Sequence, residues 1–327
     1  MQFPKMLLAK TLVAKTLFVA VLAFIGLVLL GSTKLHAQTT PFTASYQGQG
    51  VGAESCNTTF SIKGQEPSAQ GTFPVFIYTV GTLEDIGANA ASDAAISGMA
   101  SRGFVAATVQ YDTADFAGCS VIQGKARCIH DPASANSAVS VLCSRPKADC
   151  SKGVVVGGFS QGSVIATLAH DFNHEVRAAW GMGDGVQYAI FDLRSCMKSV
   201  SSGGTRTLAS DRLRVVNGVD DVFVSLGQDD GRTQAEELTG FNCGSSARSC
   251  LQSNGSGWFV VQNSQIPADL DSLDLGGNAE HCYMRSTRAV VPVQCAGLPT
   301  FLNDTWQSGS AEWSLGTNLD WLRSFVP

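Results

Sequence analysis

The chain of 327 residues has 22 lysines and arginines against 27 aspartates and glutamates, which gives a formal net charge of −5. Hydrophobic residues make up 44% of the chain and charged residues 15%, a balance typical of folded rather than disordered proteins. Because the charge is acidic and no basic cluster is present, nucleic acids and anionic lipid surfaces are not expected as partners.

The first 37 residues have the layout of a secretory signal peptide. Three lysines precede an apolar run over 17–30, and the segment ends at the small residue Ala37. The run is shorter than the roughly 20 apolar residues of a membrane span. We therefore predict cleavage after Ala37, no stable membrane span afterwards, and a secreted or periplasmic location. The mature chain, residues 38–327, would carry a net charge of about −9, because four lysines and no acidic residue are removed.

Strands and helices alternate along the remaining sequence. A cysteine-bearing excursion without a clear pattern covers 110–130. Strands that alternate with helices predict one α/β domain with a mostly parallel, doubly wound sheet, whose sites lie at the carboxyl ends of the strands. The predicted elements are extended segments over 42–47 and 58–62, strands over 74–80, 104–109, 153–157, 176–180, 213–217 and 258–261, and helices over 88–101, 132–143, 163–169, 233–239 and 319–325.

The segment Gly158–Gly162 has the sequence Gly-Phe-Ser-Gln-Gly, a G-x-S-x-G motif. A valine-rich strand precedes it and a helical pattern follows it, which is the context of a nucleophile elbow. The glycines are needed because side chains at their positions would collide with the neighbouring strand and helix. Such a turn exposes the serine hydroxyl next to backbone N–H groups at a helix N-terminus, which can hold an oxyanion. The motif therefore predicts Ser160 as a nucleophile.

A serine nucleophile needs a neighbouring base, normally a histidine that a carboxylate orients. Of the five histidines, His36 is removed with the signal peptide. His170 and His174 lie roughly 15 Å or more along the helix that begins at the elbow. His130 lies in a loop framed by cysteines, where a surface or capping role is expected. His281, on a loop after the strand over 258–261, is the predicted base.

Three carboxylates are candidates for orienting the histidine. Asp220 and Asp221 follow the strand over 213–217, and Asp184 follows the strand over 176–180. All three lie between the predicted nucleophile and the predicted base, which gives the chain order Ser, Asp, His. Spacing alone does not choose among them.

With these motifs, the chain resembles the α/β-hydrolase superfamily over nearly all of residues 38–327. The matching segments are 158–162, 217–221 and 280–282, and the elbow is similar to that of secreted cutinase and acetylxylan-esterase-like enzymes. In this superfamily the acid commonly comes three residues after the glycine that ends its strand. The resemblance therefore implies Asp221 as the acid.

The resemblance also implies an oxyanion hole built from the backbone N–H groups of Gln161 and Thr82. The chain has Val-Gly-Thr before the second donor, where members of the superfamily often have His-Gly. The implied activity is hydrolysis of a small-molecule or polymeric carboxylic ester through an acyl-enzyme, with no cofactor. A serine peptidase of the same fold and a non-catalytic binding protein are the alternatives, and the oligomeric state is open.

A second pattern, His170-Asp-Phe-Asn-His174, has the i, i+4 spacing that H-E-x-x-H proteins use to bind zinc. Here an aspartate replaces the glutamate, and no third ligand is evident. We therefore expect no metal site.

The chain has ten cysteines, and none of them forms C-x-x-C. An even number of cysteines after an export signal indicates disulfides. Spacing favours four local pairs, namely Cys119–Cys128, Cys143–Cys150, Cys243–Cys250 and Cys282–Cys295, which leaves Cys56 and Cys196 to each other. Sequence alone leaves the connectivity open.

Overall fold

The computed structural model describes residues 38–52, 55–188, 191–198, 207–225, 231–244, 249–266, 279–286 and 301–327. Residues 37–327 form one compact unit. The predicted signal peptide, residues 1–37, lies outside the described residues. Within the described ranges, no helix has both the length and the apolar character that crossing a membrane requires.

A nine-stranded sheet runs through this unit in the order β1-β2-β4-β3-β5-β6-β9-β11-β10. The parallel part consists of β4 (Val105–Val109), β3 (Val75–Thr79), β5 (Val154–Phe159), β6 (Val176–Met182), β9 (Leu213–Gly218) and β11 (Gly257–Val261). The antiparallel strands are β1 (Thr39–Gln49) and β2 (Cys56–Pro67) at one edge and β10 (Ser249–Leu251) at the other. Two short ribbons lie apart from it, β7 (Gln187–Tyr188) with β8 (Phe191–Asp192) and β12 (Arg285–Ser286) with β13 (Phe301–Leu302).

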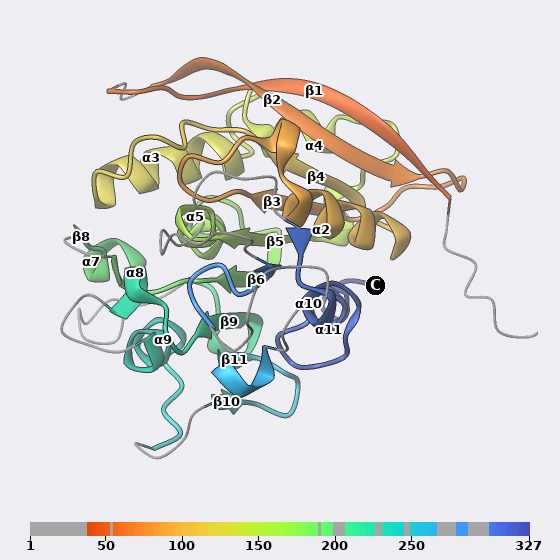
Figure 1. Ribbon diagram of the computed structural model, residues 1–327. Coiled ribbons are helices and arrows are strands. Elements are labelled where there is room, and N and C mark those ends of the chain that lie inside the picture. Colours follow the sequence, from red (N-terminus) through yellow and green to blue (C-terminus); the bar gives the residue numbers. More distant parts are fainter. Residues whose placement is uncertain are drawn as a thin grey trace, which may run out of the picture. The chain divides into compact units, whose positions relative to one another are not determined.

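Helices cover both faces of the sheet, which is why its central strands are nearly continuous apolar runs. Figure 1 shows α5 (Gln161–Thr167) and α9 (Gly231–Thr239) on one side, and α2 (Ala90–Ser101) and α11 (Leu315–Arg323) on the other. The other helices are α3 (Cys119–His130), α4 (Ala138–Cys143), α6 (Ala169–Phe172), α7 (Arg194–Met197), α8 (Val222–Ser225) and α10 (Asp304–Ser308). The mostly parallel, doubly wound sheet confirms the predicted α/β-hydrolase fold.

The segment between β4 and β5 differs from the prediction. The excursion over 110–130 contains the three-turn helix α3. The helix predicted to start after Asp131 begins only at Ala138, because Asp131 instead closes the end of α3. The side chain of Ser137 caps the later start by accepting a hydrogen bond from the N–H of Ser140. His130 is consequently the last residue of α3 and fully buried, not part of a surface loop.

Helix α3 also corrects two predicted disulfides. Cys119 and Cys128 lie at opposite ends of this helix. Nine residues of helix span roughly 13 Å, whereas a disulfide joins Cα atoms less than about 7 Å apart. Cys128 is bonded to Cys56 and Cys119 to Cys196, with Cα–Cα distances of 5.5 and 5.4 Å. The predicted pairs Cys119–Cys128 and Cys56–Cys196 are therefore wrong.

The shorter predicted pairs agree better with the structure. Cys143 is bonded to Cys150 at a Cα–Cα distance of 5.6 Å, as predicted. Cys282 is also disulfide-bonded, but its predicted partner Cys295 lies outside the described residues. Such short closed loops are typical of small stabilising crosslinks in exported domains.

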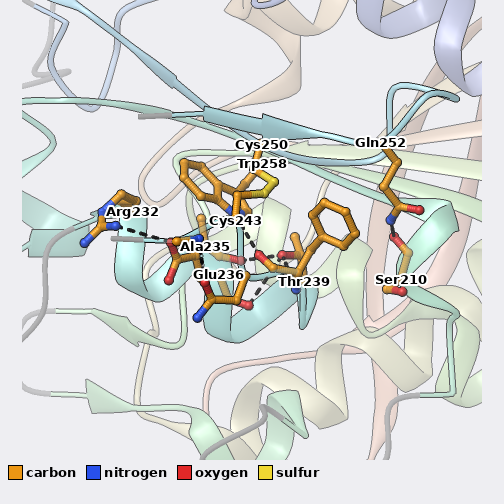
Figure 2. Close-up of a disulfide and its surroundings, with 12 residues drawn as sticks. Ser210, Arg232, Ala235, Glu236, Thr239, Cys243, Cys250, Gln252 and Trp258 are labelled. Carbon is orange, nitrogen blue, oxygen red and sulfur yellow. Dashed lines mark hydrogen bonds and ion pairs between the residues drawn. A yellow bond between two sulfur atoms is a disulfide. The ribbon is translucent and has the colours of Figure 1, made fainter. Parts of the chain in front are cut away.

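The other short pair, Cys243–Cys250, closes the connection between α9 and β10, and Figure 2 shows its surroundings. Trp258 of β11 is fully buried, and its indole N–H donates to the carbonyl oxygen of Phe241 at 2.8 Å. The hydroxyl of Thr239 donates to a carbonyl in the preceding turn of α9 at 2.8 Å. The disulfide and the Trp258 hydrogen bond fasten the segment after α9 to β10 and β11.

Candidate active site

Ser160 lies in a sharp turn between β5 and α5. It is one of three non-glycine residues with positive φ in the described ranges, at φ 53° and ψ −125°. A Cβ atom on Gly162 would lie 2.2 Å from the carbonyl oxygen of Thr79, and one on Gly158 would lie 2.4 Å from that of Gly162. Only glycines fit at these two positions, because the elbow packs directly on the end of β3. The structure thus has the strained strand–turn–helix that the motif predicts.

The predicted base and one predicted acid lie together. His281 Nδ1 and Asp221 Oδ2 are 2.7 Å apart, and the two side chains are 3% and 0% exposed. Asp221 lies three residues after the end of β9, and its Oδ1 accepts hydrogen bonds from the N–H groups of Phe223 and Val224 at the start of α8. The carboxylate is thereby held in place and presented to the imidazole.

The other two candidate acids face elsewhere. Asp220 is exposed, and its Oδ2 accepts a hydrogen bond from Asn263 at 2.7 Å. Asp184 is fully buried at the end of β6, with its carboxylate against Gly181 and the N–H of Gly185. Burial raises the pKa of Asp184 to about 7. Of the three candidates, only Asp221 has a described contact with the histidine.

The ring of Phe159, the residue before Ser160, connects the elbow to the histidine. Its centroid is 4.9 Å from that of His281 and 5.3 Å from Cζ of Arg285. On another side it meets Gly81, where an added Cβ would lie 2.9 Å from the ring. The segments that carry the elbow, the histidine and the predicted oxyanion donor therefore converge on one aromatic side chain.

The predicted oxyanion donors lie at the N-terminus of α5 and in the turn after β3. Gln161 is the first residue of α5, and Thr82 is exposed in the turn. Within the described part of the chain, neither backbone N–H donates to an acceptor. The side chain of Gln161 instead donates through Nε2 to the carbonyl oxygen of Asp115 at 2.8 Å.

The remaining histidines lie away from this arrangement. His170 belongs to α6, whereas His174 lies beyond the end of that helix, so the two do not share one helix face as the i, i+4 spacing implies. Their ring centroids are 5.3 Å apart. In the described ranges, no three side chains of the metal-ligating types gather in one place.

Sequence reasoning missed one pair of charged residues at the site. Glu84, in the turn after β3, forms an ion pair with Arg285, four residues after His281. Their side chains are 12% and 6% exposed. They are 201 residues apart in the chain. No local motif marks either residue, so only the folded structure reveals the pair.

The family models and the curated proteins contain no match to the sequence. Among solved structures, a cold-adapted esterase from an Arctic intertidal metagenomic library aligns over 90% of this chain and 97% of its own, at 14% identity and a TM-score of 0.47. A bacterial heroin esterase aligns over 94% of this chain and 90% of its own, at 13% identity and a TM-score of 0.47.

Proposed function

We propose that the chain is an exported serine hydrolase that cleaves carboxylic esters. The observation that carries the proposal is the buried pair of His281 and Asp221, whose imidazole packs on Phe159, the residue before the strained Ser160. Export rests on the signal-like residues 1–37 and fits the disulfides of the fold.

In the proposed mechanism, Ser160 Oγ attacks the ester carbonyl carbon while His281 Nε2 takes its proton. With Nδ1–H donated to Asp221, Nε2 carries the lone pair that a general base needs. The carboxylate stabilises the imidazolium, which then protonates the leaving alcohol. A water molecule, activated by the same histidine, releases the acid from the acyl-enzyme. The scheme requires no cofactor.

The tetrahedral intermediates carry an oxyanion, for which we propose the N–H groups of Gln161 and Thr82 as donors. Both are without an acceptor in the described part of the chain, so neither must break an internal hydrogen bond to serve. Gln161 also lies at the positive end of α5. Removing one such donor typically lowers turnover by about 100- to 1,000-fold.

Exposed apolar side chains around the site favour esters with an apolar acyl or alcohol group. Leu83 follows the proposed donor Thr82 and is 79% exposed. Val219, Val222 and Phe223 flank Asp221 and are 38–43% exposed. Exposed large apolar side chains on the segments that carry proposed site residues can contact an apolar part of a substrate. A small or polymeric ester with an apolar part would cover them.

The test is hydrolysis of p-nitrophenyl esters from acetyl to palmitoyl by the protein secreted from the full chain and by Ser160→Ala. Turnover that is lost in the variant supports the proposal, and the preferred acyl length defines the substrate. Turnover that survives in Ser160→Ala would contradict it. If no ester is hydrolysed, activity on peptides would favour a peptidase. Failure of an organophosphonate to label Ser160 would then favour a non-catalytic binding protein.

A further inference from the structure

The carboxylate of Glu84 is held by donors from three separate segments. Its Oε2 accepts hydrogen bonds from the N–H of Gly81 at 2.7 Å and from Nδ2 of Asn89 at 2.9 Å. Its Oε1 is paired with Nη2 of Arg285. Asn89 in turn caps α2 through its other side-chain atom, Oδ1. One buried carboxylate therefore joins the turn after β3, the start of α2 and the segment that follows His281.

Three of the four backbone N–H groups from Gly81 to Glu84 donate to acceptors within the protein. The N–H of Gly81 donates to Glu84, the N–H of Leu83 to the carbonyl oxygen of Thr113, and the N–H of Glu84 to the carbonyl oxygen of Gly81. The N–H of Thr82 has no acceptor among the described residues. Leu83 also has a positive φ of 61°, a strained conformation that surrounding contacts must hold. Of the four N–H groups from Gly81 to Glu84, that of Thr82 is therefore the one left to bind a ligand.

Arg285 connects the turn to the rest of the site. Its guanidinium lies 5.3 Å from the ring centroid of Phe159, which also packs on His281. Its side chain is only 6% exposed. An arginine that is buried needs a carboxylate partner, and charge-assisted hydrogen bonds of this kind are stronger than neutral ones.

We propose that the Glu84–Arg285 ion pair is a positioning device that fixes the N–H of Thr82 relative to Ser160 and His281. The inference rests on the function proposed above. Glu84 sets the orientation of the turn through Gly81, and Arg285 ties that turn to the segment carrying the histidine. Neither side chain has to touch the substrate. The expected effect of losing the pair is a less well placed oxyanion donor, which weakens binding of the transition state more than binding of the substrate.

The test compares Glu84→Gln with Glu66→Gln. Glu66 is a matched control, because it pairs with Arg145 at 2.7 Å and is 14% exposed, against 12% for Glu84, but lies on β2. We expect Glu84→Gln to lower kcat by about 10- to 100-fold while KM changes little, and to weaken a trifluoromethyl ketone transition-state analogue by the same factor. Glu66→Gln should leave all three values unchanged even where it lowers Tm.

A second variant, Arg285→Lys, keeps the positive charge but loses the planar guanidinium. It decides the question if Glu84→Gln does not fold. A fall in kcat at constant KM supports the proposal, and Glu84→Gln/Arg285→Lys should then be no slower than the slower single variant. An unchanged kcat in Arg285→Lys, or equal effects in Glu84→Gln and Glu66→Gln, would overturn it.

Ser160→Ala is assayed in parallel to separate this proposal from the proposed function. If Ser160→Ala retains turnover, the proposed function fails. If Ser160→Ala is inactive while kcat survives in the Glu84 variant, only the positioning role fails.

Discussion

Asp221 and its neighbour Asp220 point in different directions at the end of β9. The first lies 2.7 Å from His281 Nδ1 and is buried, whereas the second is exposed and accepts a hydrogen bond from Asn263. Two adjacent aspartates thus give a matched pair for testing the proposed triad. An amide at either position keeps the size and most of the hydrogen-bonding capacity of the carboxylate.

We expect Asp221→Asn to lower kcat/KM by about 10³- to 10⁴-fold, because the amide no longer selects the tautomer with a basic Nε2. The acceptor Oδ1 is retained, so the start of α8 and the Tm should be preserved. Asp220→Asn should leave kcat/KM unchanged. Ester hydrolysis and thermal unfolding of both variants check the prediction, and equal effects on kcat/KM at the two positions would contradict it.

A second prediction concerns two glycines that both lie in helices. Gly162→Ala would place a Cβ 2.2 Å from the carbonyl oxygen of Thr79, so the elbow or β3 must move. In Gly316→Ala, the nearest atom is 3.8 Å away at the end of the Arg102 side chain. We expect the first variant to lose ester hydrolysis and several kcal/mol of stability. The second should keep full activity and gain up to about 1 kcal/mol from better helix propensity.

Urea unfolding and ester hydrolysis of the two variants provide the comparison. Full activity in Gly162→Ala would mean that the elbow does not pack on β3 as described.

The parts of the fold that could be predicted are those with local causes. Strands buried on both faces are apolar along their whole length, and the elbow needs glycines at fixed positions, so both leave clear patterns. Helix α3 was missed because its usual start signal is absent. Its N-cap is Gly118, which makes no side-chain cap bond, and Gly124 interrupts its interior.

The candidate site likewise contains residues that a local sequence pattern marks and residues that no such pattern marks. Ser160 belongs to a motif, and His281 was found by elimination among few histidines. The choice of Asp221 over Asp220 needed the superfamily resemblance, because spacing along the chain does not distinguish two adjacent residues. The Glu84–Arg285 pair and the Cys56–Cys128 disulfide join segments that are distant in the chain, 201 and 72 residues apart. Such contacts depend on how the elements pack, which no single stretch of sequence encodes.

A third prediction follows from the corrected disulfides. The Cys119–Cys196 bond closes a loop of 77 residues and the Cys143–Cys150 bond one of 7. In the chain-entropy account, these loops correspond to about 4.5 and 2.4 kcal/mol of stabilisation. Replacing both cysteines of the long-range bond by serine should therefore destabilise the protein by about 2 kcal/mol more than the same change in the short one.

Urea unfolding of the two double variants measures that difference. Peptide mapping without reduction checks the pairing itself, since a fragment that joins Cys119 to Cys128 would contradict the structure.

A fourth prediction concerns the dependence of stability on pH. Asp184 is buried, its Oδ1 accepts the N–H of Gly185, and its Oδ2 has no hydrogen-bond partner in the described part of the chain. The nearby hydroxyls of Ser163 and Thr167 donate to the carbonyl oxygens of Ser160 and Val164. Burial therefore raises the pKa of Asp184 from 3.8 to about 7. Between these values the native state keeps a proton that the unfolded chain has lost, so this residue makes the protein less stable as the pH rises.

His130 imposes the opposite trend, because burial lowers its pKa from 6.5 to about 3 and the unfolded chain binds the extra proton between these values. The prediction therefore concerns the difference in the free energy of unfolding between the Asp184→Asn variant and the unaltered protein. The variant should gain stability relative to the protein as the pH rises from about 4 to about 7, by a few kcal/mol in all, and the gain should be constant at higher pH. Denaturant unfolding at several pH values measures this difference. A difference independent of pH would show that the pKa of Asp184 is the same in the native and the unfolded state, and would contradict the prediction.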